Sequence, residues 1–502
     1  MNVKKTLLIL LPILAFTVSA CGSVASSSSS DPASSSESST SYANPKESFS
    51  FKIKEKANRL WGLDEDAVVE FDFKYNDDYF FADATKRNDD LGLLSLGMAG
   101  VNGTKETINN FFNAIHYTKI YNSPSYDKNT YHSIAYTIAQ KTVDDYVIVA
   151  TSVRGFYYHL EMVGNFFLGE SGDHKDFTGA MEAVYAGLTD YLAREVPAGS
   201  KVKLWLAGYS RAAAVTNLLS KHIYDKALEG TLKGVDKKDI YAYCFETPSC
   251  AVYNGQESFS FIHNYMNSRD FITFIPPKQY GFKVYGDVID IYQSNVAEIV
   301  KNFDSRLIYT EFKPYYLSLD LSSEKIVEFK ENPNGEKDLK KFIETMLAKA
   351  TEKTSDYDVE SATDLSTRTK YANIVEKHIE PTADLVLSIT PEQLEIIIPA
   401  LKENVSTIVT SMLRADYDTL VATVESILDE AQVAYNEEEL RSLFTDLRGV
   451  IMHYLAQYFQ DITGPSVVNS AVSMVKNIIP IIGLHLLETS YSLMKYMIAN
   501  NK

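Results

Sequence analysis

Residues 202–219 read VKLWLAGYSRAAAVTNLL, which is an apolar run, a short turn and a second run with helical spacing. The first run predicts a buried strand, and the second predicts a helix that begins at Ser210. A sharp turn there presents the serine hydroxyl at the carboxyl end of a sheet, beside a helix N-terminus whose amides favour negative charge. Gly208 and Ala212 are small enough for the strand and helix to cross closely. The pattern predicts a nucleophile elbow at Ser210; the alternative is an ordinary serine cap on a core helix.

The segments around this elbow, from residue 48 to residue 290, alternate between strand and helix patterns. An early strand or hairpin is expected at residues 71–75 and 79–82. Further strands are expected at residues 131–139, 146–150, 201–207, 240–245 and 261–267. Helices are expected at residues 91–99, 105–115, 176–195 and 210–228. Because strands that alternate with helices pair in parallel, the sequence predicts an α/β fold with a mostly parallel sheet covered by helices.

Helical periodicity replaces the strand patterns after about residue 290. Helices are expected at residues 323–348, 391–413, 417–434, 437–459 and 466–500, whereas the polar residues 351–369 predict a loop. We therefore expect three parts in the folded body. They are a core of residues 48–290, a helical insertion or cap of residues 291–465, and a C-terminal helix within residues 466–502 that returns to the core.

The N-terminus has the order of a bacterial export signal. Residues 1–20 contain two lysines, an apolar run too short for a membrane span and small residues before Cys21. The sequence VSAC at 18–21 resembles a lipoprotein lipobox, in which Cys21 is lipidated and begins the mature chain. Residues 21–47 then form a serine-rich tether. We expect an extracytoplasmic protein anchored to the membrane by this lipid; the alternative is a plain secretory signal with a chance cysteine.

The composition excludes several classes of protein. The chain has 502 residues, 45% of them hydrophobic, and 48 basic against 66 acidic residues give a net charge of −18. Nucleic-acid binding needs a basic face, so this balance argues against it. Three cysteines cannot build a disulfide scaffold, and we expect no disulfide between Cys244 and Cys250. The sequence has no CxxC pair or His/Cys cluster of the kind that binds zinc.

A serine nucleophile needs a base and an acid that orients it, and in this fold they follow in the chain order Ser, Asp, His. Asp270 ends a predicted strand and should lie on the same rim of the sheet as Ser210. His485 stands at a junction between a loop and a helix, where an imidazole can be aimed freely. His453 lies within a predicted helix and His378 within a polar segment, so they are the weaker candidates for the base.

An oxyanion hole needs two backbone donors. The N–H of Arg211, directly after the predicted nucleophile, is one candidate. The second candidate is the N–H of Phe156, because a tight turn at Arg154 and Gly155 follows the buried strand at 146–150. The alternative is a plain glycine turn.

These residues together resemble the class 3 lipases, and most closely the bacterial lipase-like branch of that family. The resemblance covers about residues 131–287 and the C-terminal helix. YCFETP at 243–248 is similar to the Tyr-x-Phe-Gly-x-Pro strand of the family. The other matches are VATSVRGF at 149–156, EMVGNF at 161–166, SGDHKDF at 171–177, the segment 267–277, GFKVYG at 281–286 and HLLE at 485–488. The departures are Ala212 and Asp176, each at a position where the family has Gly, and the long gap between Asp270 and His485.

The resemblance implies an α/β-hydrolase with Ser210, Asp270 and His485 as its catalytic triad and Phe156 and Arg211 as its oxyanion donors. It implies a carboxylic ester hydrolase of the lipase or esterase type that works through an acyl-enzyme. This chemistry requires no metal and no organic cofactor. The expected substrates are lipid esters or small esters, and Ile396–Leu413 is a candidate wall for an apolar acyl pocket.

A second interpretation stays open at this level. The protein would then be a non-catalytic surface lipoprotein that uses a hydrolase fold as a binding module, because a fold does not imply a function. The sequence does not distinguish a lipase from an esterase, a phospholipase or a thioesterase, and it does not fix the oligomeric state.

Overall fold

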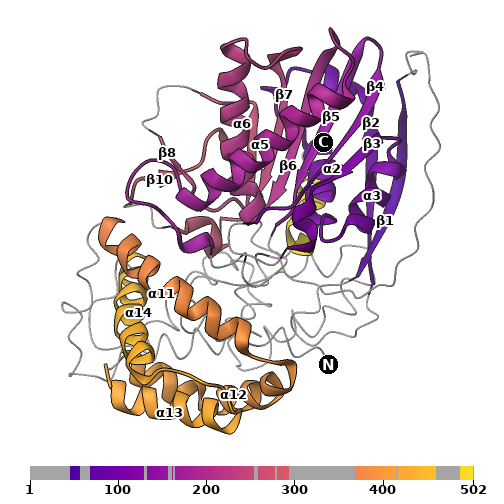
Figure 1. The fold of residues 1–502 in the computed structure, drawn as a ribbon. Coiled ribbons are helices and arrows are strands. Elements are labelled where there is room, and N and C mark those ends of the chain that lie inside the picture. Colours follow the sequence, from indigo (N-terminus) through magenta and orange to yellow (C-terminus); the bar gives the residue numbers. More distant parts are fainter. Residues whose placement is uncertain are drawn as a thin grey trace.

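The computed structural model of this chain describes two regions. One is a sheet with helices on its faces, and the other is a group of helices within residues 368–458 (Figure 1). The described residues are 46–56, 68–128, 133–155, 161, 164–253, 258–268, 270–276, 280–292, 368–413, 415–458, 485 and 487–500. The predicted signal peptide, Cys21 and nearly all of the predicted tether therefore lie outside the described residues.

The central sheet has seven strands in the order β11-β9-β7-β6-β5-β4-β3. The five strands from β11 to β5 are parallel, and β4 and β3 continue the sheet in antiparallel fashion. The strands are β3 (Thr118–Asn122), β4 (Tyr136–Val143), β5 (Tyr146–Val153), β6 (Lys201–Tyr209), β7 (Val235–Phe245), β9 (Ile262–Met266) and β11 (Asp287–Asp290). This mostly parallel sheet with its helices fits an α/β-hydrolase, as predicted.

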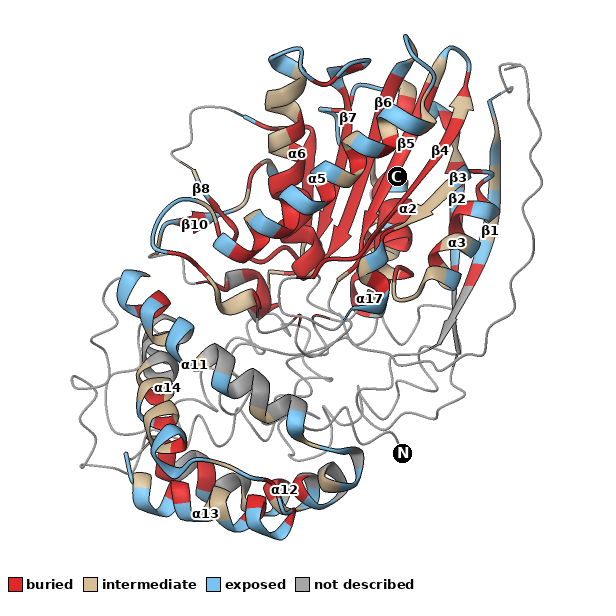
Figure 2. Cartoon of the chain, in the orientation of Figure 1, coloured by how far each residue is buried: buried red, intermediate tan, exposed pale blue. Residues whose placement is uncertain are grey.

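Helices cover both faces of the sheet, and strand β6 shows how. The indole N–H of Trp205 donates to Ser95 Oγ on α2 (Asp89–Gly100), at 2.7 Å. Gly208 lies against α6 (Arg211–Leu228), on the other face, since residues three apart on a strand point in opposite directions. Helix α5 (Lys175–Glu195) lies beside α6, and α17 (Leu487–Asn500) packs on α2. Strands β4, β5 and β6 are almost entirely buried between these layers (Figure 2), whereas the edge strands β3 and β11 have no fully buried residue.

A separate hairpin corrects one prediction. The early strand β2 (Val68–Asn76) pairs with β1 (Ser48–Lys56), and residues 79–82 do not form a strand. The Asn76 side chain instead accepts from the N–H of Asp78 at 2.9 Å and caps a short 3₁₀ turn, η4 (Asp77–Phe81). This cap turns the chain out of the strand direction. The hairpin packs on α3 (Lys105–Ala114) and, through the ring of Tyr491, on α17.

The remaining elements of the core are short. The strands β8 (Ala251–Val252) and β10 (Phe282–Lys283) pair with each other, and three 3₁₀ turns are η5 (Pro124–Asp127), η6 (Gly164–Phe166) and η7 (Phe271–Phe274). Strands β3 and β11 were not predicted, and the strand predicted at 131–139 begins later, at Tyr136. No helix among the described residues is long and apolar enough to cross a membrane.

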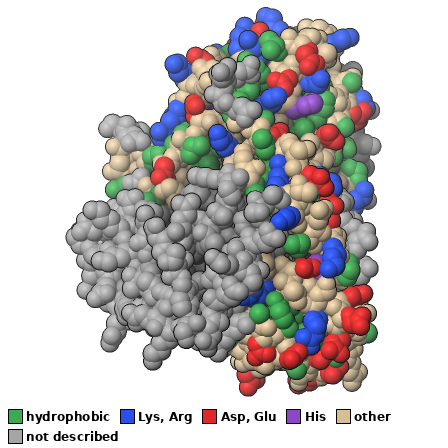
Figure 3. Space-filling view, turned by 90° about the vertical axis from the view of Figure 1, so that its left-hand side faces the viewer, with side chains coloured by type: hydrophobic (Ala, Val, Ile, Leu, Met, Phe, Trp, Pro, Cys, Tyr) green, Lys and Arg blue, Asp and Glu red, His purple; other side chains and the backbone are tan. Residues whose placement is uncertain are grey.

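The helical region contains α11 (Arg368–Ser388), α12 (Pro391–Leu413), α13 (Tyr417–Glu430) and α14 (Glu437–Tyr458). The prediction at 391–413 matches α12, and those at 417–434 and 437–459 match α13 and α14 to within a few residues at their ends. Helix α11 was missed, and the predicted helix at 323–348 lies outside the described residues. In Figure 3, acidic side chains gather at the end of the molecule opposite the core.

Helix α11 contacts the core directly. The guanidinium of Arg368 donates to the carbonyl oxygens of Gly169 and Gly172, at 2.6 and 2.7 Å, and lies 4.3 Å from the ring centre of Phe282. Lys175 Nζ also lies 2.6 Å from the carboxylate of Glu376. These contacts join the first three turns of α11 to the loop before α5 and to the first residue of α5.

Candidate active site

Ser210 occupies the turn between β6 and α6, and its backbone is strained. Its φ is 58° and its ψ is −129°, a conformation that costs about 1–3 kcal/mol for a residue with a side chain. The N–H of Ser210 donates to the Phe245 carbonyl oxygen at 2.9 Å, which ties the turn to the end of β7. The neighbouring Gly208 has no space for a side chain, because a Cβ there would lie 2.3 Å from the Ala212 carbonyl oxygen. The local sequence therefore builds the elbow that it predicts.

The structure brings three predicted residues together at this turn. His485 Nε2 lies 2.7 Å from Ser210 Oγ, and His485 Nδ1 is hydrogen-bonded to Asp270 Oδ2. The side chains of Asp270 and His485 are fully buried, whereas Ser210 is partly exposed. The imidazole thus bridges a hydroxyl at the surface and a carboxylate in the interior. Tyr209 holds the backbone of His485, since the Tyr209 hydroxyl donates to the His485 carbonyl oxygen at 2.6 Å.

Asp270 is held in place by the turn that follows strand β9. Its Oδ1 accepts from the N–H of Ile272 at 3.0 Å and caps η7, and its own N–H donates to the Asn267 carbonyl oxygen at 2.9 Å. The hydroxyl of Thr273 donates to the Asp270 carbonyl oxygen at 2.8 Å. With Oδ1 engaged by the backbone, Oδ2 is the oxygen that faces the imidazole.

The two weaker histidine candidates lie elsewhere in the chain. His378 is on α11, where its Nε2 contacts Asp446 Oδ2 of α14 at 2.5 Å. His453 is on α14, and its side chain is outside the described part. Among the described histidines, only His485 makes a hydrogen bond with Ser210.

Of the two predicted oxyanion donors, Arg211 lies among the described residues and Phe156 does not. Arg211 is the first residue of α6, and the N–H of such a residue has no partner within its own helix. Phe156 lies outside the described residues. The turn before it is described, and a Cβ on Gly155 would lie 3.1 Å from the Tyr209 carbonyl oxygen. The end of β5 therefore runs close to the elbow.

Two buried ion pairs brace the residues of this predicted hole, and sequence reasoning did not anticipate either pair. Arg211 donates to Asp176 Oδ2 at 2.8 Å, with both side chains at most 2% exposed. Arg154 donates to Glu161 Oε1 at 2.6 Å and is equally buried. The signal for the first pair was present in the sequence, because Asp176 replaces a glycine of the family motif opposite an arginine in the elbow.

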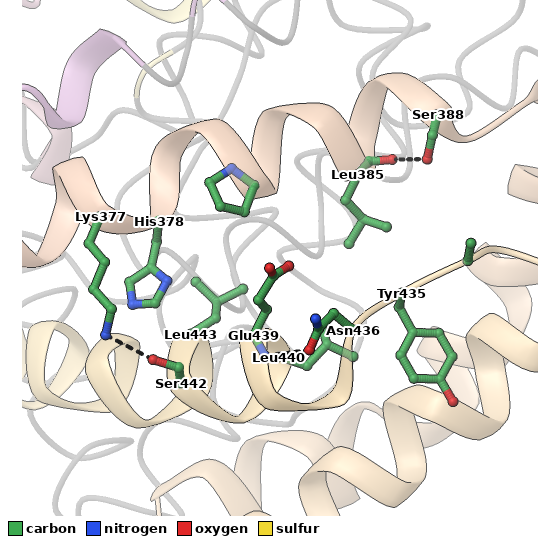
Figure 4. A pocket seen from close by; sticks show the side chains of 12 residues that line it. Lys377, His378, Leu385, Ser388, Tyr435, Asn436, Glu439, Leu440, Ser442 and Leu443 are labelled. Atoms are coloured by element: carbon green, nitrogen blue, oxygen red, sulfur yellow. Dashed lines mark hydrogen bonds between the residues drawn. The ribbon is translucent and has the colours of Figure 1, made fainter.

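A cavity of about 770 Å³ lies in the helical region and not at the elbow. It lies between α11 and α14, as Figure 4 shows, with Lys377, His378 and Leu385 on the side of α11 and Leu440 and Ser442 on the side of α14. Ser210, Asp270 and His485, called the Ser210 cluster below, are not among its lining residues. Helix α12 packs against α13 and α14. Within the predicted wall at Ile396–Leu413, the described side chains of Ile397, Leu401, Ile408 and Met412 are buried, whereas Ile396 is exposed.

The described part of the chain contains two cysteines. Cys244 and Cys250 are both buried and free, and burial raises the pKa of each thiol well above its ordinary value. In the described ranges, no three or more His, Cys, Asp or Glu residues lie together as a metal-binding group.

Comparison with known proteins gives a distant likeness to fungal lipases. A fungal lipase–inhibitor complex is 15% identical, with 39% of this chain and 77% of that chain covered and a TM-score of 0.29. Rhizomucor miehei lipase in its native propeptide complex is 15% identical, with 40% and 68% covered and a TM-score of 0.28. The lipase of Rhizopus microsporus var. chinensis is 14% identical, with 38% and 70% covered and a TM-score of 0.27. Neither a family model nor a curated protein matches this sequence. Likeness at this level identifies neither the family nor the activity of the chain.

Proposed function

We propose that the protein is a serine hydrolase that cleaves carboxylic esters of lipids through Ser210, Asp270 and His485. The observation that carries the proposal is the imidazole of His485, which contacts Ser210 Oγ on one side and the Asp270 carboxylate on the other. A strained serine at the N-terminus of a helix, a histidine and a buried carboxylate in this order are the parts that acyl transfer needs.

The proposed reaction begins when Ser210 Oγ bonds to the ester carbonyl carbon while His485 Nε2 accepts the hydroxyl proton. Asp270 holds the other ring nitrogen as N–H and stabilises the imidazolium. The carbonyl oxygen becomes an anion that the Arg211 N–H, the dipole of α6 and the Phe156 N–H would stabilise. The bond to the alcohol then breaks, and Nε2 returns the proton to the leaving oxygen. Water repeats these steps on the acyl-enzyme and releases the carboxylic acid.

The proposed location follows from the N-terminus. A lipid on Cys21 and a serine-rich tether would hold the enzyme beside a membrane outside the cytoplasm, where lipid esters are at hand. No metal or organic cofactor takes part. Replacement of Cys21 by serine should move the protein from the membrane fraction to the soluble fraction; retention of the variant in the membrane would count against the anchor.

A fluorophosphonate probe tests the proposed nucleophile directly, because it bonds covalently to an activated serine. We expect labelling of the full protein and no labelling of Ser210→Ala. The matched control is Ser388→Ala, which removes an exposed hydroxyl at the end of α11. Chromogenic esters of increasing chain length then define the preferred acyl group. Labelling that persists in Ser210→Ala would reject the proposed nucleophile, and a folded protein that neither reacts nor hydrolyses would favour the binding-module interpretation.

A further inference from the structure

Glu246 occupies an unusual position for a glutamate. It follows strand β7 with a φ of 47°, in the left-handed region that residues with side chains rarely adopt. It also stands where the motif of the resembling family has glycine, the residue for which this conformation carries no strain. Its side chain is nevertheless fully buried. A glutamate that accepts both backbone strain and burial is best explained by the contacts of its carboxyl group.

The carboxyl group of Glu246 connects three elements around the proposed triad. Its Oε2 accepts from the N–H of Asn267 at 2.8 Å, at the end of β9. Its Oε1 accepts from the hydroxyl of Ser490 at 2.6 Å, in the first turn of α17, shortly after His485. Asn267 also accepts from the N–H of Asp270 at 2.9 Å, so the two carboxyl groups share one turn, and the Asp270 carboxyl acts on that of Glu246.

Two buried carboxyls cannot share a hydrogen bond if both are ionised, so one must carry a proton. Burial, and then the negative charge of Asp270, raise the pKa of Glu246 well above its ordinary value. The other groups that act on it, Ser490 from α17 and the N–H of Asn267, are neutral. Asp270, by contrast, has its Oδ2 hydrogen-bonded to the imidazole of His485, a partner that Glu246 lacks. The proton of this pair therefore belongs to Glu246.

We propose that Glu246 is a positioning residue that remains a neutral carboxylic acid and donates a hydrogen bond to the Asp270 carboxylate. The role rests on the proposed function, since Asp270 acts there through His485. The bond fixes the second face of a carboxylate whose other contacts are the N–H of Ile272 and the imidazole. It also links Asp270, through Ser490, to the helix that follows His485.

This arrangement differs from the other buried carboxylates near the elbow. Asp176 and Glu161 each face a guanidinium, and they form ion pairs. Glu246 faces a carboxylate, so a proton takes the place of the positive partner. An ionised Glu246 would add a second negative charge beside Asp270, and both side chains are fully buried.

Two variants separate the hydrogen bond from the carboxyl group itself. Glu246→Gln keeps the size and supplies an amide N–H to Asp270, so kcat should stay within a few-fold of the parent. Glu246→Gly removes the donor and relieves the backbone strain, and kcat should fall by about 10-fold to 100-fold with little change in KM. The acid limb of kcat/KM should move to higher pH in Glu246→Gly, because Asp270 without its donor attracts the imidazolium of His485 more strongly.

A second measurement does not depend on catalysis. The infrared difference spectrum between the parent protein and Glu246→Gln at neutral pH should show the carbonyl stretch of a protonated carboxylic acid. Absence of this band would overturn the proposal even in an active esterase, and its presence would support it even if no ester is hydrolysed. Equal loss of kcat in both variants with an unchanged acid limb would also overturn it, because a purely structural side chain would behave in that way.

Discussion

The core and the helical region of this protein are built on different principles. In the core, strand register and a crowded turn fix each functional side chain, as the missing space at Gly208 shows. In the helical region, four described helices pack on one another. Helix α11 reaches the core through polar contacts of Arg368 and Glu376 and through the buried ring of Tyr371, whose centre lies 6.0 Å from that of Tyr280. The chain passes through this region between Asp270 and His485, yet both residues meet at the elbow of the core. The position of a residue in the fold, and not its distance along the chain, therefore sets its chemical surroundings.

The strongest test of this difference compares two histidines. Replacement of His485 by alanine should lower kcat for a soluble ester by about 10⁴-fold or more, because the proposed base is lost. His378→Ala, in the helical region, should change kcat little, since that ring contacts Asp446. Steady-state kinetics with far-UV circular dichroism as a folding check would measure both. A large loss of kcat in His378→Ala and a small one in His485→Ala would show that the base lies in the helical region, which would contradict the proposal.

The second test compares two ion pairs for their effect on stability. Asp176→Ala leaves the guanidinium of Arg211 buried and unpaired, which should lower the free energy of unfolding by about 3–5 kcal/mol. Asp446→Ala removes a partly exposed carboxylate that contacts Lys377 and His378, and the loss should be about 1 kcal/mol or less. Urea unfolding followed by circular dichroism gives both values. Similar small losses would show that the buried pair does not brace the elbow.

The elbow and its surroundings were predictable because several local signals coincide. The apolar strand, the small residues at 208 and 212 and the following helical run lie within one short stretch. Strands β5, β6, β7 and β9 and helices α2, α3, α5, α6 and α12 were expected for similar reasons, since each carries a regular apolar pattern. The partners of Ser210 were harder to predict, because only the route of the chain decides which of three late histidines meets it.

The missed features have physical reasons. Strand β3 lies at the edge of the sheet and none of its residues is fully buried, so it shows no buried alternation. Helix α11 contains Pro381 and begins in a polar stretch, and both features argue against a helix. The role of Glu246 depends on contacts with β9 and α17 that a linear pattern does not contain. Tertiary contacts of polar residues, in contrast to apolar periodicity, leave little trace in one sequence.

The third test uses pH and the buried His174, which caps α5. Burial lowers the pKa of His174 from 6.5 to about 4, and the nearby Asp176 opposes the shift only in part. The unfolded chain therefore binds a proton between these pH values that the folded chain excludes, so stability falls as the pH drops from 6.5 to 4. The expected loss from this group is about 3 kcal/mol. In His174→Asn, the amide oxygen replaces the ring Nδ1 as the acceptor that caps α5. Urea unfolding of this variant at several pH values should show a shallower decline; an unchanged slope would contradict the assignment.

The smallest expected effect lies where the two regions meet. Arg368→Ala removes a guanidinium that donates to Gly169 and Gly172 and covers the ring of Phe282. Without it, amide hydrogen exchange should become faster in the first turns of α11 and in the loop before α5. The control Lys377→Ala removes a surface contact within the helical region and should leave that loop unchanged. Because the Ser210 cluster is built from the core and α17, kcat for a short soluble ester should change little in either variant. A marked fall in kcat for Arg368→Ala alone would show that the docking of α11 helps to form the site, and the separation of the two regions would then be incomplete.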